Sequence, residues 1–132
     1  MTEHEFTLEE ARELVSWLAE IFRMLELPRA KAVQLDAAVK ELSGKIAGNG
    51  AGSSHKQLQR QQDALREVSA EIDAAVSDIR ERGIHVKGVS PGLVDFPHAR
   101  DGRQVYLCWR EGESKIAFWH DIDTGFAGRQ PL

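Results

Sequence analysis

Apolar residues recur at seven-residue intervals through two stretches of the first two-thirds of the chain. The first stretch contains two interleaved rows and the second stretch one row: Leu14, Ile21, Leu35 and Leu42; Ala11, Leu18, Leu25, Ala32, Val39 and Ile46; Leu58, Leu65, Ile72 and Ile79. A seven-residue repeat keeps such side chains on one face of an α-helix. The pattern therefore predicts two long amphipathic helices, which form a helical hairpin over residues 7–83.

Short polar patterns mark where these helices begin. Thr7 and Glu10 have the spacing of a capping box, in which each side chain bonds a free backbone N–H of the first helical turn. Ser54 and Gln57 have the same spacing. The residues between the helices are rich in glycine and serine, so we expect a flexible loop at 48–54.

The first helical stretch contains Pro28, yet its seven-residue rows continue through this position. This continuity favours one long helix that is bent near Pro28, or two helices nearly in line. The alternative is a true break with Pro28 at the first position of a new helix. The first stretch has about 40 residues and the second about 28, so their lengths differ by about 18 Å. The excess helical surface must pack on the last third of the chain or on a second subunit, and we expect a homodimer.

The last third of the chain has the alternation and the turn signals of β-strands. Strands are predicted at 84–89, 92–96, 103–110 and 115–122, and short loops between them favour antiparallel pairing. We therefore expect an α+β fold, in which the helical hairpin packs on a small antiparallel β-meander of three to four strands. The final residues contain Phe126 and Arg129 among glycines, which predicts a tail that folds back onto the body.

The register of the last predicted hairpin decides which side chains share a face. A two-residue turn at 112–113 and a four-residue loop at 111–114 both pair Leu107 with Phe118 and Val105 with His120. Either loop places Cys108 and His120 on opposite faces of the sheet. A three-residue loop would shift the register and change these pairs.

Composition restricts the class of protein. The chain has 132 residues, which is typical of a single domain at 1–132, with the hairpin at 7–83 and the sheet and tail at 84–132. The net charge is −4 and no segment forms a basic block, so we expect no binding to nucleic acid. The acidic N-terminus lacks the features of a secretion signal, and no apolar run has the length of a membrane span. We therefore expect a cytoplasmic protein that does not bind membranes.

Candidate site residues gather in the last third of the chain. His120 stands at the end of an apolar strand, and Asp95 lies within another, where a carboxylate needs a partner. Glu113 in the turn and Arg129 in the tail are further candidates, and three residues nearby are secondary ones: Cys108, Arg110 and Asp121. Together these groups could hold a divalent metal or a small anionic ligand, although no pair has a recognised metal-binding spacing. The alternative for each is a structural role in hydrogen bonding or packing.

Several strings of the sequence occur together in a characteristic order. These strings are FTLEEARELV, GLVDFP, RDGRQVYLCWREGE and FWHDIDTGFAGRQPL. In this order the sequence resembles the bacterial DUF2203 family of unknown function, over nearly the whole chain. The resemblance implies a small intracellular protein from bacteria or archaea, and it brings no activity, substrate or cofactor.

Two functions from different classes remain open at this point. The unequal helices and the lack of a known catalytic motif favour a non-enzymatic interaction or assembly module, which self-associates through its helices. The polar groups of the last third favour a protein that binds a metal or a small anionic ligand and could be an enzyme.

Overall fold

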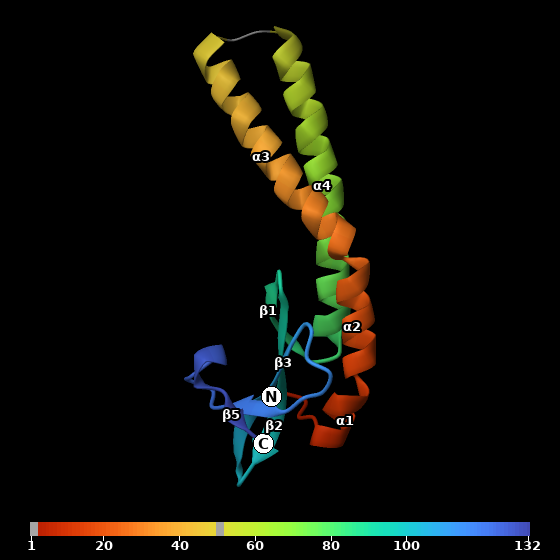
Figure 1. The fold of residues 1–132 in the computed structure, drawn as a ribbon, viewed down its shortest axis with the longest axis vertical. Coiled ribbons are helices and arrows are strands. Elements are labelled where there is room, and N and C mark those ends of the chain that lie inside the picture. Colours follow the sequence, from red (N-terminus) through yellow and green to blue (C-terminus); the bar gives the residue numbers. More distant parts are fainter. Residues whose placement is uncertain (1–2, 50–51) are drawn as a thin grey trace. The chain divides into compact units, whose positions relative to one another are not determined.

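The computed structural model describes residues 3–49 and 52–132 and combines α-helices with an antiparallel sheet (Figure 1). The chain divides into two compact units, which we name by their content. The sheet unit comprises residues 3–23 and 76–132, and the helical unit comprises residues 24–49 and 52–75. This division is compatible with one domain or two, so the single-domain organisation stays a prediction.

The N-terminal helices begin at the predicted capping box. Helix α1 (Leu8–Glu13) follows Thr7, whose hydroxyl accepts a hydrogen bond from the Glu10 N–H, while the Glu10 carboxylate accepts one from the Thr7 N–H. These bonds lower the pKa of Glu10 below its usual value. Helix α2 (Val15–Met24) comes directly after, and the N–H of Leu18 donates to the carbonyl oxygen of Leu14 at 2.9 Å across the junction.

The first helical path consists of three helices rather than one long helix. The helical path is interrupted at Leu14 and at Leu25, and helix α3 (Glu26–Asn49) contains Pro28 as its third residue. The first-turn N–H groups of a helix have no intrahelical partner, so a proline at this position costs no hydrogen bond within α3.

The helical unit is an antiparallel pair formed by α3 and the first part of α4 (Gly52–Glu81), as Figure 1 shows. The predicted loop at 48–54 is too long, because α3 continues to Asn49 and α4 already begins at Gly52. The predicted capping box at Ser54 is therefore wrong as well, since Ser54 lies inside the helix. Residues 50–51, the remainder of the predicted loop, lie outside the described residues.

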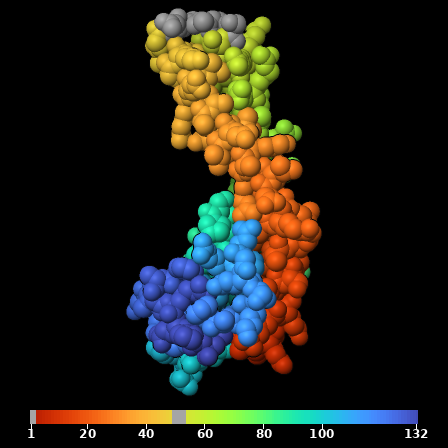
Figure 2. Space-filling view, in the orientation of Figure 1, coloured from red at the N-terminus to blue at the C-terminus, as the bar shows by residue number. Residues whose placement is uncertain are grey.

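The sheet has five strands rather than the expected three to four. In spatial order they are β1 (His85–Val89), β2 (Gly92–Arg100), β3 (Arg103–Arg110), β4 (Phe118–His120) and β5 (Gln130–Pro131), and each pairs antiparallel with its neighbour. One edge strand, β1, has an irregularity between Val86 and Gly88. The other edge strand, β5, has two residues and belongs to the C-terminal segment, which lies against the rest of this unit (Figure 2).

The register between β3 and β4 differs from the prediction by one residue. Leu107 lies opposite Trp119, and Tyr106 lies opposite His120. The connection comprises residues 111–117 instead of two to four residues, and its own hydrogen bonds hold it: the Trp109 indole N–H donates to the Glu113 carbonyl oxygen at 2.9 Å. A shift of one residue turns every side chain of β4 to the other face. His120 therefore shares a face with Cys108, and not with Leu107 as predicted.

Helices cover one face of the sheet, where the core of the sheet unit lies (Figure 1). The ring of Phe22 from α2 packs 6.1 Å from the Trp109 ring, and the ring of Phe6 packs 5.3 Å from Phe96. These side chains are buried together with apolar residues of both layers: Ala11, Leu18, Val76, Ile79, Val94, Val105 and Leu107. The helix-covered face thus uses the apolar positions of β2 and β3 and leaves their other face to a different set of residues.

Candidate functional site

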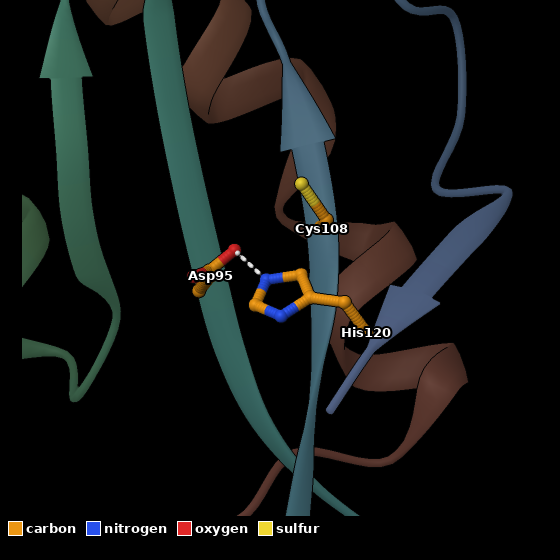
Figure 3. Close-up of side chains that lie close together, drawn as sticks. All are labelled: Asp95, Cys108 and His120. Atoms are coloured by element: carbon orange, nitrogen blue, oxygen red, sulfur yellow. Dashed lines mark hydrogen bonds and ion pairs between the residues drawn. The ribbon is translucent and has the colours of Figure 1, made fainter. Parts of the chain in front are cut away.

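Three polar side chains meet on the second face of the sheet, and each comes from a different strand. Asp95 of β2 lies opposite Cys108 of β3, and His120 of β4 lies opposite Tyr106, which is two residues before Cys108 on the same face of β3 (Figure 3). One potential ligand atom from each residue lies within 4.8 Å of the other two. All three residues are buried, with 3% of Asp95, 2% of His120 and none of Cys108 exposed.

The imidazole of His120 is fixed at both nitrogens. Its Nδ1 lies 2.8 Å from the backbone carbonyl oxygen of Asp121, and its Nε2 lies 3.0 Å from Oδ1 of Asp95. A carbonyl oxygen only accepts hydrogen bonds, so Nδ1 carries a proton. The bond to Asp95 needs a second proton between Nε2 and Oδ1, which makes the pair either imidazolium with carboxylate or neutral imidazole with carboxylic acid.

Cys108 is a neutral thiol in this environment. Burial, and after it the negative charge of Asp95, raise the pKa of the thiol from about 9 to about 12. The positive charge of Arg129 acts in the opposite direction but does not outweigh them. At neutral pH the cluster therefore presents one thiol, one imidazole and one carboxyl group.

The ion pair of Arg129 and Glu113 lies close enough to affect the pKa of the Cys108 thiol. The Nη2 of Arg129 donates to both carboxylate oxygens of Glu113, at 2.9 and 2.7 Å. The guanidinium also stacks over the rings of Phe118 and Phe126, at 4.1 and 4.6 Å. The four primary candidates from the sequence are thus held in two pairs, Asp95 with His120 and Glu113 with Arg129.

Comparison with known proteins agrees with the sequence resemblance. The model of a family described as "Uncharacterized conserved protein (DUF2203)" matches residues 4–132. The chain belongs to the DUF2203 family. No curated protein and no solved structure matches the chain.

The secondary candidates of this DUF2203 chain have different surroundings. Cys108 joins the buried cluster, which contradicts the predicted separation of Cys108 from His120. Asp121 forms an ion pair with Arg103 at 2.8 Å and contributes only its backbone carbonyl to His120. Arg110 is exposed at the end of β3 and lines a hollow of about 340 Å³ with Leu93 and Phe126.

The sequence of this DUF2203 chain contains every member of the cluster but gives no direct sign of how the members meet. The signal that could have found the cluster is the alternation of Asp95 and Cys108 on adjacent strands, combined with a longer loop before β4. Chemically, a thiol, an imidazole nitrogen and a carboxylate oxygen form a mixed donor set that suits transition metals better than Mg²⁺ or Ca²⁺.

Within the described residues, no helix has the combination of length and apolar character that a membrane span needs.

Proposed function

We propose that the chain binds a divalent transition-metal ion, with zinc as the first choice, through Asp95, Cys108 and His120. The observation that carries the proposal is the convergence of three donor atoms of three kinds within 4.8 Å. Sulfur, imidazole nitrogen and carboxylate oxygen are the three ligand types of protein zinc sites. Three protein ligands leave one position of a tetrahedral ion for water or a small anion.

The hydrogen bond at Nδ1 of His120 supports this role. Histidines that bind metals through one ring nitrogen usually donate the other N–H to a carbonyl or a carboxylate, which fixes the orientation of the ring. Nδ1 of His120 donates in this way to the carbonyl of Asp121 and leaves Nε2 directed at the cluster. The imidazole would only have to exchange its bond to Asp95 for a bond to the ion.

Charge balance also supports a divalent ion. Buried charges are costly unless they are compensated. A doubly positive ion with one thiolate, one carboxylate and one neutral imidazole has no net charge, and the nearby Glu113 and Arg129 already neutralise each other. Binding would release the thiol proton of Cys108, so the affinity should rise with pH.

Metal analysis of the purified protein tests the proposal. We expect about one zinc per chain after loading and dialysis, and a large loss of zinc in Asp95→Asn, Cys108→Ser and His120→Asn. Substitution with cobalt should produce the absorption of a cobalt–thiolate bond, which Cys108→Ser removes. His55→Ala is the matched control because His55 is an exposed imidazole on α4. A wild-type protein that retains neither zinc nor cobalt would refute the metal site.

We further propose that the chain is an assembly module that self-associates through its helical unit. The observation that favours this second function is the lack of buried residues: within 26–48 and 54–75, where exposure is described, none is buried. Two helices that bury so little of their apolar rows gain little stability on their own, because helices in proteins depend on packing. Light scattering should give twice the 14.7 kDa mass of one chain, and a mass of one chain at micromolar concentration would refute self-association.

A further inference from the structure

The helical unit has a groove that combines apolar floor residues with charges of opposite sign. It is a hollow of about 550 Å³ between α3 and α4, and we call it the helical groove. Val39 of α3 and Leu65 of α4 contribute apolar side chains, and both remain half-exposed. The groove therefore exposes part of the rows that a helical bundle would bury.

Small residues occupy the middle of the groove. Ser69 and Ala70 are consecutive on α4, and both line the hollow. The distance between two packed helices depends on the size of the side chains at their contact, and small side chains allow a close approach. The middle of the groove is thus the point where another helix can come nearest to α4.

Arg66 and Asp73 line the groove on either side of these small residues. They are seven residues apart, or about 10 Å along the helix, and so lie on the same face. Arg66 pairs with the exposed carboxylate of Asp63, whereas Asp73 has no ion-pair partner in the part of the chain that the structure describes. The groove therefore offers a cation at one end and an available anion at the other.

We propose that two copies of the chain dock through their helical grooves with their α4 helices antiparallel. The midpoint between positions 66 and 73 falls between Ser69 and Ala70. A two-fold axis at that point brings Arg66 of each copy opposite Asp73 of the other, with the small residues at the crossing. This interface rests on the proposed self-association and specifies where and in which direction it occurs.

A second copy fits this groove because the groove is complementary to itself. One two-fold operation pairs Arg66 and Asp73 of each copy with the opposite charges of the other copy. It also places four helices around the half-exposed apolar rows that contain Val39 and Leu65. Four-helix bundles bury such rows in their common core. Residues 26–48 and 54–75, none of which is buried in a single copy, would then acquire a buried core.

Charge reversal tests the interface. Arg66→Glu and Asp73→Lys each place like charges opposite one another twice in a homodimer, so we expect the dissociation constant to rise about tenfold or more. A mixture of the two variants restores both attractive pairs and should dimerise as tightly as the wild type. The double variant should do so as well. Sedimentation at several concentrations measures all four cases.

The matched control is Arg60→Glu, because Arg60 is an exposed arginine on the same helix and does not line the groove. Circular dichroism verifies that each variant keeps its helices. A monomeric wild type would overturn self-association altogether. A dimeric wild type whose dissociation constant is unchanged by both reversals would overturn the helical groove as the interface and leave self-association standing.

Discussion

The imidazole Nε2 of His120 lies 3.0 Å from the carboxyl oxygen Oδ1 of Asp95, and both side chains are buried. Because Nδ1 is already bonded to the carbonyl of Asp121, the two side chains depend on each other for the remaining proton. Neither residue can be removed without leaving a buried polar atom that has lost its partner. The metal-free cluster is therefore sensitive to the substitution of either residue.

Substitution of Asp95 should separate the loss of charge from the loss of the hydrogen bond. Asp95→Ala removes the hydrogen-bond partner of Nε2 of His120, and we expect the free energy of unfolding to fall by about 3–5 kcal/mol. Asp95→Asn can still donate to a neutral imidazole, so its loss should be about 1 kcal/mol. Urea denaturation with a chelator present measures both values.

The control for this comparison is the more exposed ion pair between Asp121 and Arg103. Asp121→Asn should cost less than about 1 kcal/mol, since exposed pairs contribute little. Equal losses for Asp95→Ala and Asp121→Asn would contradict a buried, mutually dependent pair.

Cys108 should make the metal-free protein less stable at alkaline pH. Its thiol titrates near 9 when exposed and at about 12 in the folded chain, because of burial and the charge of Asp95. The folded state therefore holds more protons than the unfolded state between these values, and stability falls as pH rises from 9 toward 12, by up to about 1.4 kcal/mol per pH unit. Below pH 8 this dependence should be absent.

The comparison of wild type with Cys108→Ala isolates this effect, because the raised pKa of Tyr106 acts in the same direction in both proteins. Urea denaturation from pH 7 to 11 with a chelator gives the two slopes. Identical slopes would show that the thiol does not contribute.

Replacement of Arg129 by lysine should destabilise the fold. Its guanidinium stacks on Phe118 and Phe126 while it bonds to Glu113, and a lysine ammonium cannot reproduce the planar stack. We expect Arg129→Lys to lower the free energy of unfolding by about 1–2 kcal/mol. Arg110→Lys is the control, with a change within about 0.5 kcal/mol, because Arg110 is exposed. Thermal unfolding of both variants checks the difference, and a neutral Arg129→Lys would mean that the stack contributes nothing.

Two glycine substitutions should change the free energy of unfolding in opposite directions. A Cβ atom at Gly92 would lie 2.7 Å from the ring of Phe22, which is fully buried, so Gly92→Ala should cost about 1–3 kcal/mol. A Cβ atom at Gly44 in α3 would meet nothing within 4 Å, and Gly44→Ala should add about 0.5–1 kcal/mol through helix propensity. Chemical denaturation measures both changes. A stabilising Gly92→Ala would show that Phe22 can move aside.

The sequence predicts those parts of the fold that depend on local patterns. Alternation along β3 correctly places Leu107 and Trp109 on one face and Cys108 on the other, and the cap at Thr7 is confirmed. A local pattern cannot predict the face of the sheet on which His120 lies, because this face depends on the length of the connection before β4. Hydrogen bonds hold the path of that connection, including the one from the Trp109 side chain of β3 to the Glu113 carbonyl.

The remaining errors have similar causes. The two residues of β5 are too few to show any alternation, and their strand exists only because they pair with β4. Pro28 gives the same sequence signal whether it ends a helix or lies in its first turn.

Both edges of the sheet are poorly suited to pairing with a strand of another molecule. β1 has its irregularity beside the exposed Lys87, and β5 ends in Pro131, which has no backbone N–H to donate. Charged side chains, irregular ladders and proline are the means by which sheets avoid edge-to-edge growth into fibrils. Native chains should therefore tolerate crowding without aggregating through their strands. Any rise in the light scattering of concentrated samples should come without a gain of β-structure.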